Sequence, residues 1–412
     1  MSVLLTRRAV VQTAIEDTYG VAANVGLSDG VLVSKPTFTV TPNILERDFT
    51  RDTLSQQAHI VGRLLAKMEF ETELRSNGNS NSGLPSSAPI IARLFRACGY
   101  TLTGNAASSL IGPFTIGAAL NDIAWTPDVS AATNTDMIAY FLQVTTGGPS
   151  GTAMITVSSD TAGESAAAAL VTAGTPIPIG TKGLTLTPAF AGTLITGTRW
   201  VVWLTPSGVQ LRPISNNFES ASLVMYKDGV KHTMPGSFGT FEITAAAGTF
   251  GSIKWTFTGI YKAPVDQVMP SPVYEKTLPA QVELGRLRLD TFSAVVEKFT
   301  FNQKNDIQIR PDVSSSQGYI GTRIVSRKPE GGVNPEADTV ANYDFWGIFA
   351  AATRIPFQMR VGTTVGNTVW MIAPAAQYSG MTYTDRQGIM AYDAGLTFPG
   401  YQADDEFFLY FA

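Results

Sequence analysis

Side chains that could carry out chemistry are scarce in this sequence. Among 412 residues there is one cysteine, Cys98, and there are two histidines, His59 and His232. A single cysteine excludes an internal disulfide, and no His, Cys, Asp or Glu cluster shows metal-ligand spacing. No G-x-S-x-G motif accompanies the histidines, so we interpret both as polar residues of strands. The sequence therefore predicts no enzyme, no cofactor and no metal site.

Charge is also sparse. Charged residues make up 15% of the chain and the formal net charge is −4, whereas soluble domains usually contain about 25% charged residues. Proteins that grip nucleic acid through its phosphates need dense basic patches, and none occurs here. Hydrophobic residues make up 44%, enough for large cores. A foldable but charge-poor chain is typical of proteins that bury much of their surface against copies of themselves.

Long apolar runs are missing as well. No stretch approaches the roughly 18 consecutive apolar residues of a membrane span. The first residues, MSVLLTRRAVVQTAIEDTYG, place arginines after a short apolar stretch, which is the wrong order for a signal peptide. We therefore expect a protein made in the cytosol that does not insert into membranes.

Strand signals dominate what is present. Residues 252–259 alternate so that Ile253, Trp255 and Phe257 share one face, as in a half-buried antiparallel strand. The pair Asp228-Gly229 predicts a hairpin between 221–226 and 230–233.

Two helices are expected. The first covers 88–99, with Ser86 or Ser87 as its cap and Gly99 at its end, and the second covers about 342–353.

Residues 105–210 differ from the rest of the chain. Ala, Thr, Gly, Ser and Pro dominate, short strands alternate with turns, and no helix is indicated, which predicts a β-sandwich inserted into a surface loop. Trp125, Trp200 and Trp203 in this insert either fill its core, the interpretation we favour, or offer stacking surfaces for a carbohydrate.

The chain also contains an internal repeat. Residues 52–63 and 312–323 both read D-x-x-S-x-Q-x-x-I-x-x-R. Each copy follows an alternating strand (Phe38-Thr39-Val40 and Phe299-Thr300-Phe301) and precedes another strand, a loop and one of the two helices. The economical interpretation is one β-rich domain present twice, joined by the proline-containing segment Pro264–Pro279.

Several segments together resemble one known family. They are Ile44–Ser55, Ala88–Leu94 with Cys98-Gly99, Tyr226–His232, and Gly239–Phe241 followed by Trp255–Tyr261. In their order and in their amino-acid sequences, these segments resemble the tail tube, or major tail, proteins of long-tailed, non-contractile bacteriophages. The resemblance covers most of the chain outside the insert.

The resemblance implies a mainly β fold, with two β-sandwich or barrel domains of the tail-tube type, each with one flanking helix, and an inserted Ig-like β-sandwich. The expected division is an N-terminal arm (1–29), a first tube domain (30–104 plus 211–268), the insert (105–210), a linker (269–279) and a second tube domain (280–412). Inner strands of neighbouring subunits would join into a barrel around a DNA-sized channel. A homotrimer with pseudo-sixfold symmetry would then replace the hexamer of single-domain relatives.

The resemblance also places the ring-stacking loops at about Pro42–Ile60 and Asn302–Ile320. The residues expected at contacts between subunits are Arg47, Asp52, Ser55, Gln57, Arg63, Asp312, Ser315, Gln317 and Arg323. Expected partners are further copies of the chain, the tape measure, tail terminator and distal tail proteins, and double-stranded DNA that passes through without specific binding. The protein would be assembled in the host bacterial cytoplasm and reside in the virion tail. Two alternatives remain open, a capsid decoration or head–tail connector protein, and a carbohydrate-binding virion protein that acts through the insert.

Overall fold

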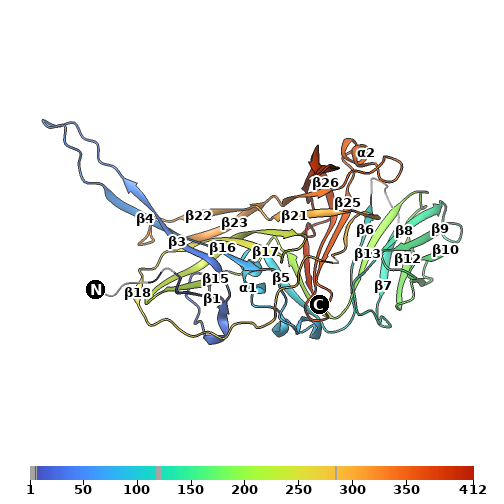
Figure 1. The fold of residues 1–412 in the computed structure, drawn as a ribbon, viewed down its shortest axis with the longest axis horizontal. Helices are drawn as coiled ribbons and strands as arrows, with labels where there is room; N and C mark the ends of the chain where they lie inside the picture. Colours follow the sequence, from blue (N-terminus) through green and yellow to red (C-terminus); the bar gives the residue numbers. More distant parts are fainter. Residues whose placement is uncertain (1–4, 6, 117–122, 284) are drawn as a thin grey trace.

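A computed structural model of the chain describes residues 5, 7–116, 123–283 and 285–412. Most of it consists of antiparallel strands, which confirms the predicted mainly β class (Figure 1). The predicted N-terminal arm and insert fall partly outside the described residues. The strands before the insert are β1 (Ala9–Ile15), β2 (Gly30–Val31), β3 (Ser34–Leu45), β4 (Ile60–Glu73) and β5 (Tyr100–Asn105).

The remaining strands follow in chain order. The insert region contains β6 (Ser109–Ile116), β7 (Ile123–Asp128), β8 (Ile138–Thr146), β9 (Met154–Ser159), β10 (Ala166–Leu170), β11 (Ile177–Ile179), β12 (Leu184–Phe190) and β13 (Arg199–Thr205). After it come β14 (Gly208–Pro213), β15 (Ala221–Lys227), β16 (Val230–Ala246), β17 (Ser252–Ile260), β18 (Val265–Asp266), β19 (Leu287–Leu289), β20 (Phe292–Ser293), β21 (Val296–Asn302), β22 (Asn305–Pro311), β23 (Tyr319–Arg327), β24 (Glu330–Pro335), β25 (Ile355–Val361), β26 (Val369–Arg386), β27 (Ile389–Thr397) and β28 (Phe408–Phe411).

One long sheet runs through the middle of the molecule. Its strand order is β3-β4-β17-β16-β21-β24-β27-β26, and every neighbouring pair is antiparallel. The first four strands come from before the proline-containing segment and the last four from after it. We call β3, β4, β17 and β16 the first unit, and β21, β24, β27 and β26 the second unit. The pairing of β16 with β21 joins the two units within the chain.

The two units have the same strand order and the same long bent strand. β16 pairs with β15 through its first half and with β17 and β21 through its second half. β26 likewise pairs with β25 and β28 before it enters the long sheet beside β27. The irregularities also match, since β16 carries Gly236 at positive φ and β26 has a register shift between Tyr378 and Gly380 at the corresponding place. The two units therefore share one arrangement of strands.

A single apolar core lies against one face of the long sheet. Trp255, Phe257, Phe241, Phe299 and Phe301 all point into it and are buried. The strands of residues 252–260 and the Asp228-Gly229 hairpin form as predicted, with Lys227 opposite Val230 across the turn. Both turn residues have positive φ, as a type I′ hairpin requires.

Both predicted helices exist but are shorter than expected. α1 spans Ala92–Ala97 and α2 spans Phe345–Ala350. The prediction that Ser86 or Ser87 caps the first helix is wrong. Ala88 precedes a proline and is extended, at φ −64° and ψ 142°, because the proline ring disfavours the helical region for the residue before it. The helix therefore starts later, and the Glu275 carboxylate accepts a hydrogen bond from the Ile90 N–H instead.

The predicted end of the first helix at Gly99 is confirmed. Gly99 follows α1 at φ 86°, the left-handed conformation that commonly ends a helix and that glycine adopts without strain. Ala352 takes the corresponding position after α2 at φ 49°. At the start of α2, the Asp344 side chain accepts a hydrogen bond from the Gly347 N–H.

Strands β6 to β13 form two further sheets with a core of their own. One has the order β10-β9-β8-β13-β6 and the other β11-β12-β7. They lie at one end of the molecule, opposite the end from which the β3–β4 hairpin projects (Figure 1). Trp200 and Trp203 are buried and Trp125 packs edge-on against Trp200. This burial supports the interpretation that the tryptophans are core residues.

The insert region packs on a sheet that holds strands from both halves of the chain. β5 and β14, which flank it, pair with each other, and β14 also pairs with the C-terminal β28. Trp203 lies in a cluster with Trp370 and Tyr410, and its indole N–H donates to Gln358 Oε1 at 2.6 Å. Arg199 forms a two-point ion pair with Asp290. The insert is thus held mainly against the residues that follow the linker.

Candidate assembly surfaces

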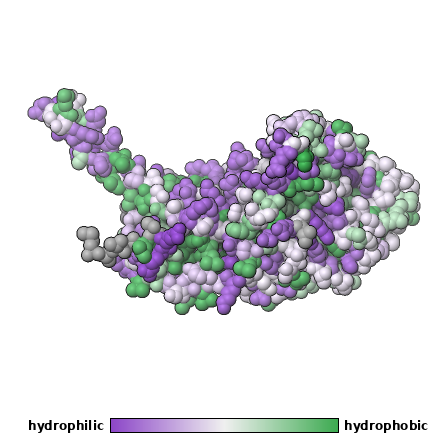
Figure 2. All heavy atoms as spheres, viewed as in Figure 1, coloured by the Kyte–Doolittle hydropathy of each residue, from purple (hydrophilic) through white to green (hydrophobic). Residues whose placement is uncertain are grey.

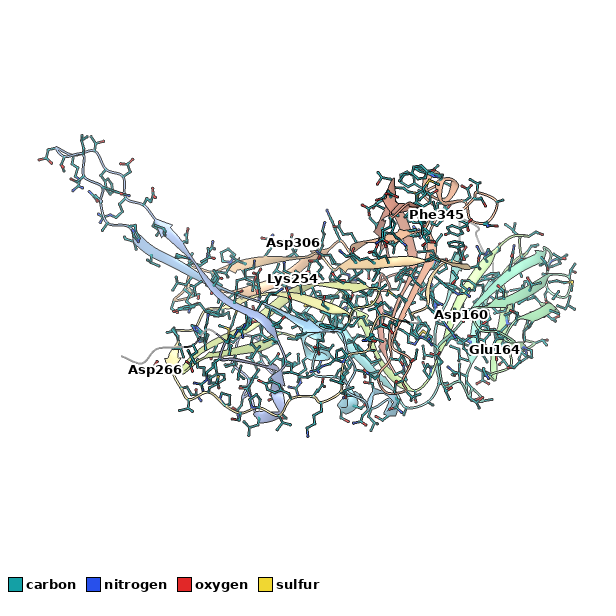
Figure 3. The ribbon with its side chains drawn as sticks, viewed as in Figure 1. Asp160, Glu164, Lys254, Asp266, Asp306 and Phe345 are labelled. Atoms are coloured by element: carbon teal, nitrogen blue, oxygen red, sulfur yellow. The ribbon has the colours of Figure 1, made fainter. Side chains whose placement is uncertain are left out.

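The second face of the long sheet is polar, and we call it the polar face. Because side chains alternate along a strand, each strand contributes every second residue to it. Its members from the first unit are Thr37, Thr39, Lys67, Glu69, Glu71, Lys254, Thr256, Thr258, Thr240, Glu242 and Thr244, and those from the second unit are Lys298, Thr300, Asn302, Glu330, Asp393, Thr382, Thr384 and Arg386. Figure 3 shows Lys254 in the middle of this sheet.

Charges on the polar face are interleaved. Lys254 lies directly opposite Glu71 on one side and Glu242 on the other, and opposite charges at such positions stabilise a sheet. The Lys67 ammonium group lies 2.7 Å from the Glu69 carboxylate. A hydrogen bond from Lys67 lowers the pKa of Glu69, against a smaller opposing effect of burial. The face therefore offers no unopposed positive cluster that would hold a phosphate backbone.

The long sheet ends in two strands with an unpaired edge. Among the residues that the structure describes, β3 pairs with β4 alone, and the second half of β26 pairs with β27 alone. An open edge of this kind presents free N–H and C=O groups to another strand. Pro36 and Pro42 interrupt the donors of β3, which restricts where a second strand can pair.

Two long hairpins extend from the sheet and contain the repeated motif. We call residues 42–62, the far part of β3–β4 with its tip, the projecting hairpin, and β22–β23 (305–327) the packed hairpin. The projecting hairpin extends far from the body (Figure 1), and its surface mixes polar and apolar residues (Figure 2). Ile44, Leu45, Ile60, Val61 and Leu54 are exposed on it.

The packed hairpin lies instead on the first unit. Tyr19 Oη donates to the Thr322 carbonyl and accepts from the Thr322 N–H. Tyr319 Oη donates to the Leu64 carbonyl at 2.7 Å. The Asn305 amide donates to the carbonyls of Cys98 and Gly239. These contacts join the packed hairpin to α1, β4 and β16.

The residues expected at contacts between subunits lie on these two hairpins or, for Arg63, at the base of one of them. In the packed hairpin, Gln317 Nε2 donates to the Tyr261 carbonyl, the Arg323 guanidinium lies over the Phe218 ring, and Ser315 Oγ donates to the Tyr319 carbonyl. The Asp312 carboxylate accepts from the Ser314 N–H and so shapes the tip.

In the projecting hairpin, Arg47 lies over Phe49 and the Ser55 carbonyl accepts from Arg51. Asp52 and Gln57 lie in the tip between β3 and β4, whereas Arg63 lies on β4 at the base of the hairpin, next to Leu64, which pairs with Pro42. No ion pair joins Asp52 to Arg63, or Asp312 to Arg323, in the part of the chain that the structure describes.

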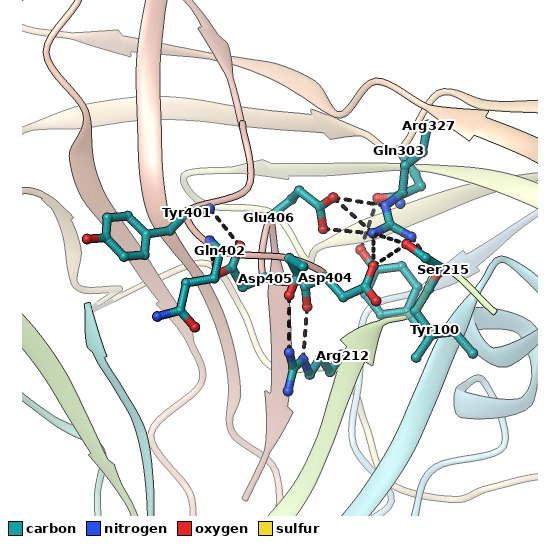
Figure 4. Close-up of polar contacts among 12 residues, drawn as sticks. Tyr100, Arg212, Ser215, Gln303, Arg327, Tyr401, Gln402, Asp404, Asp405 and Glu406 are labelled. Carbon is teal, nitrogen blue, oxygen red and sulfur yellow. Dashed lines mark hydrogen bonds and ion pairs between the residues drawn. The ribbon is translucent and has the colours of Figure 1, made fainter. Parts of the chain in front are cut away.

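The acidic run at 404–406 has a role that the sequence did not indicate. The Arg327 guanidinium at the end of the packed hairpin binds Asp404 and Glu406 and donates to the Ile214 carbonyl (Figure 4). Burial alone would lower the pKa of Arg327, but these carboxylates outweigh it and raise the pKa. The run thus ties the packed hairpin to the body.

Chemically reactive groups do not converge anywhere among the described residues. No group of three or more His, Cys, Asp or Glu there has metal-site geometry. Cys98 is buried beneath α1, and burial raises the pKa of its thiol. His232 packs against Phe38, and burial lowers its pKa. No helix in the described ranges is long and apolar enough to cross a membrane.

Sequence reasoning missed the polar face and the edge of β26. The signal for the face was present, because Thr, Lys and Glu alternate with apolar residues along 66–73 and 252–258. Nothing local marks the β26 edge, since whether a strand has a second neighbour depends on residues far away in the sequence.

The comparison with known proteins agrees with this architecture. No curated protein matches the chain. A family model described as "Phage tail tube protein" matches residues 6–400, which is nearly the whole chain and includes the insert and both hairpins. The chain belongs to the phage tail tube protein family.

Proposed function

We propose that this protein is the structural subunit of a phage tail tube, and that its rings stack around a channel through which the viral genome leaves. The observation that carries the proposal is the long sheet, which joins two like units by β16 and β21 and ends in two unpaired edges, β3 and β26. An edge that repeats around a closing rotation makes a ring rather than an open fibre. Closure also removes the exposed edges.

The internal joint supports a ring of three chains. Each chain supplies two units of the same strand order, so a trimer would have six units and pseudo-sixfold symmetry. The polar face would line the channel, because the other face is covered by the core. Threonines and interleaved charges let DNA slide past without being held. The insert, at the far end of the chain, would lie outside the tube.

The expected partners follow from this arrangement. The two hairpins are proposed to reach neighbouring rings, through Arg47, Asp52, Ser55, Gln57 and Arg63 in one case and Asp312, Ser315, Gln317 and Arg323 in the other. A tape measure protein would occupy the channel during assembly, and terminator and distal tail proteins would close the ends of a non-contractile tail built in the host cytoplasm. Catalysis has no role in this function, and the family favours it over capsid decoration or head–tail connection.

Electron microscopy of the purified protein tests the proposal. End-on views should show rings with an open centre and six inner lobes that fall into two alternating kinds. Native mass measurement should give a multiple of three chains. A protein that remains monomeric at high concentration, and also when tail-initiation proteins are added, would contradict it.

A further inference from the structure

The first and second units differ in how well their edge strands are covered. In the first unit, Phe241 of β16 packs against Phe95 of α1 and Phe301 of β21, and only 1% of its surface is exposed. The equivalent residue of the second unit is Tyr383 of β26, which is 57% exposed although it packs against Trp346 of α2. The difference arises because β21 and the packed hairpin cover the first unit at this edge, whereas no strand of the described residues pairs with the second half of β26 on its outer side.

The equivalence of Phe241 and Tyr383 follows from the strand register. Phe38 and Phe299 occupy the same place in the repeat. In the first unit, Phe38 pairs with Met68, which pairs with Phe257, which pairs in turn with Gly239. In the second unit, Phe299 pairs with Val333, which pairs with Ala394, which pairs in turn with Met381. Gly239 and Met381 therefore correspond, and so do the residues two positions further on.

The helices show the same asymmetry. α1 buries Ala92, Leu94, Phe95 and Ala97, whereas α2 buries only Phe345. Trp346, Ile348 and Phe349 of α2 remain half-buried. α1 packs on β16 and α2 packs on β26, so the second unit has an open apolar surface where the first has a covered one.

The projecting hairpin, unlike the packed hairpin, is exposed and extends away from the body (Figure 1). It corresponds to the packed hairpin, because the two strands are interrupted at equivalent positions. In β3 the register shifts between Pro42 and Ile44, and Lys304, at positive φ, separates β21 from β22. The stem of the projecting hairpin exposes Ile44, Leu45, Ile60 and Val61. The stem and the β26 edge are both apolar and exposed, and they correspond to parts that pack together within the chain, the packed hairpin and the β16 edge. This correspondence indicates a contact between two copies.

We propose that the stem of the projecting hairpin of one copy docks on the β26–α2 surface of the next copy, with β3 pairing to β26 in the register that β21 shows with β16. This inference rests on the proposed function and adds the register and the docking site to it. Within the chain, Glu242 lies opposite Asn302, and the corresponding residues of the new contact are Thr384 and Thr41. Thr244 lies opposite Thr300, and the corresponding residues are Arg386 and Thr39.

This register has a further consequence for backbone hydrogen bonds. The Gln303 N–H donates to the Phe241 carbonyl, so residues 241 and 303 form a hydrogen-bonded pair and residues 242 and 302 do not. Thr41 and Thr384 would likewise form a non-hydrogen-bonded pair, with Cβ atoms about 4.5–5.5 Å apart. The ladder would end there, because Pro42 has no N–H to donate. The hairpin stem then extends the contact beyond the short ladder.

Disulfide trapping with the variant Thr41→Cys/Thr384→Cys tests the proposal on assembled tubes. Both positions are exposed, so the chain should fold normally, and Cys98 is buried and needs no replacement. Mild oxidation should link most chains into dimers and trimers on non-reducing gels. The variant Thr244→Cys/Thr300→Cys is the internal control, which should form a disulfide within one chain.

A register control uses Thr41→Cys/Thr382→Cys. These residues would share a face but lie diagonally, about 7–8 Å apart, beyond the usual Cβ separation of a disulfide of about 3.5–4.5 Å. We expect at least a tenfold slower cross-linking than for Thr41→Cys/Thr384→Cys. Tubes that form normally but do not cross-link through 41 and 384, or that cross-link faster through 41 and 382, would overturn the proposed register. Absence of any ring or tube in microscopy of the unmodified protein would instead overturn the proposed function, and the docking proposal with it.

Discussion

The ion pairs of Arg327 should contribute measurably to the stability of the folded chain. Its guanidinium lies 2.9 Å from the Glu406 carboxylate and also binds Asp404, Ser215 and the Ile214 carbonyl. Removing one partner of a buried ion pair costs about 3–5 kcal/mol. Here the Arg327, Asp404 and Glu406 side chains are 13%, 26% and 16% exposed, so water replaces part of the loss. We expect Arg327→Ala to lower the free energy of unfolding by about 2–3 kcal/mol.

Urea unfolding followed by tryptophan fluorescence measures this loss. Arg310→Ala is the matched control, because Arg310 lies on the same packed hairpin and is exposed; its cost should stay within about 0.5 kcal/mol. A loss below about 1 kcal/mol for Arg327→Ala would refute the reasoning, since it would place this arginine among ordinary surface ion pairs.

The same ion pairs predict a dependence on pH. Burial would raise the pKa of Asp404, but hydrogen bonds from Ser215 and Arg327 outweigh it and lower the pKa below its ordinary value of 3.8. A carboxylate with a lowered folded-state pKa stabilises the protein above its unfolded-state pKa and loses that contribution as the pH falls through the folded value. The difference between the unmodified protein and Arg327→Ala should therefore be constant near neutral pH and shrink below about pH 3.8. A difference that shrinks already at pH 6 would contradict this assignment.

Three further changes have defined outcomes. Gly99→Ala forces a side chain into φ 86° and against Ile324, and should lower the midpoint of urea unfolding by more than Gly151→Ala, which has a similar φ but open space around it; equal shifts would exclude the contact. Trp255→Ala empties a fully buried site and should cost about 3–5 kcal/mol in the same assay; a cost under 2 would mean that the core collapses around the cavity. Gln358→Ala leaves the buried Trp203 N–H without its acceptor and should speed limited proteolysis between the insert and the body; an unchanged cleavage rate would contradict the role of this bond.

Local patterns predicted the strands and turns well. The alternation in 252–259 and the Asp228-Gly229 turn identify β17 and the β15–β16 hairpin because their causes lie within a few residues. The first helix begins later than the sequence pattern predicts, because Pro89 keeps Ala88 extended.

Long-range features were predicted only through the repeat. The D-x-x-S-x-Q-x-x-I-x-x-R motif located both hairpins, but it did not show that one is packed on the chain and the other projects. That difference depends on the pairing of β16 with β21, which brings together residues about 60 positions apart and leaves no local sequence pattern. The docking of the insert through Trp203 and Gln358 was equally out of reach, because each residue alone reads as an ordinary core or surface position.

The joint between β16 and β21 also bears on the kinetics of assembly. It forms between parts of one chain, so its formation is unimolecular and does not weaken on dilution. In the proposed ring, half of the joints between units would thus be complete before any two molecules meet. The remaining joints alone would respond to protein concentration, and nucleation of a ring would follow a lower reaction order than for chains that carry one unit each.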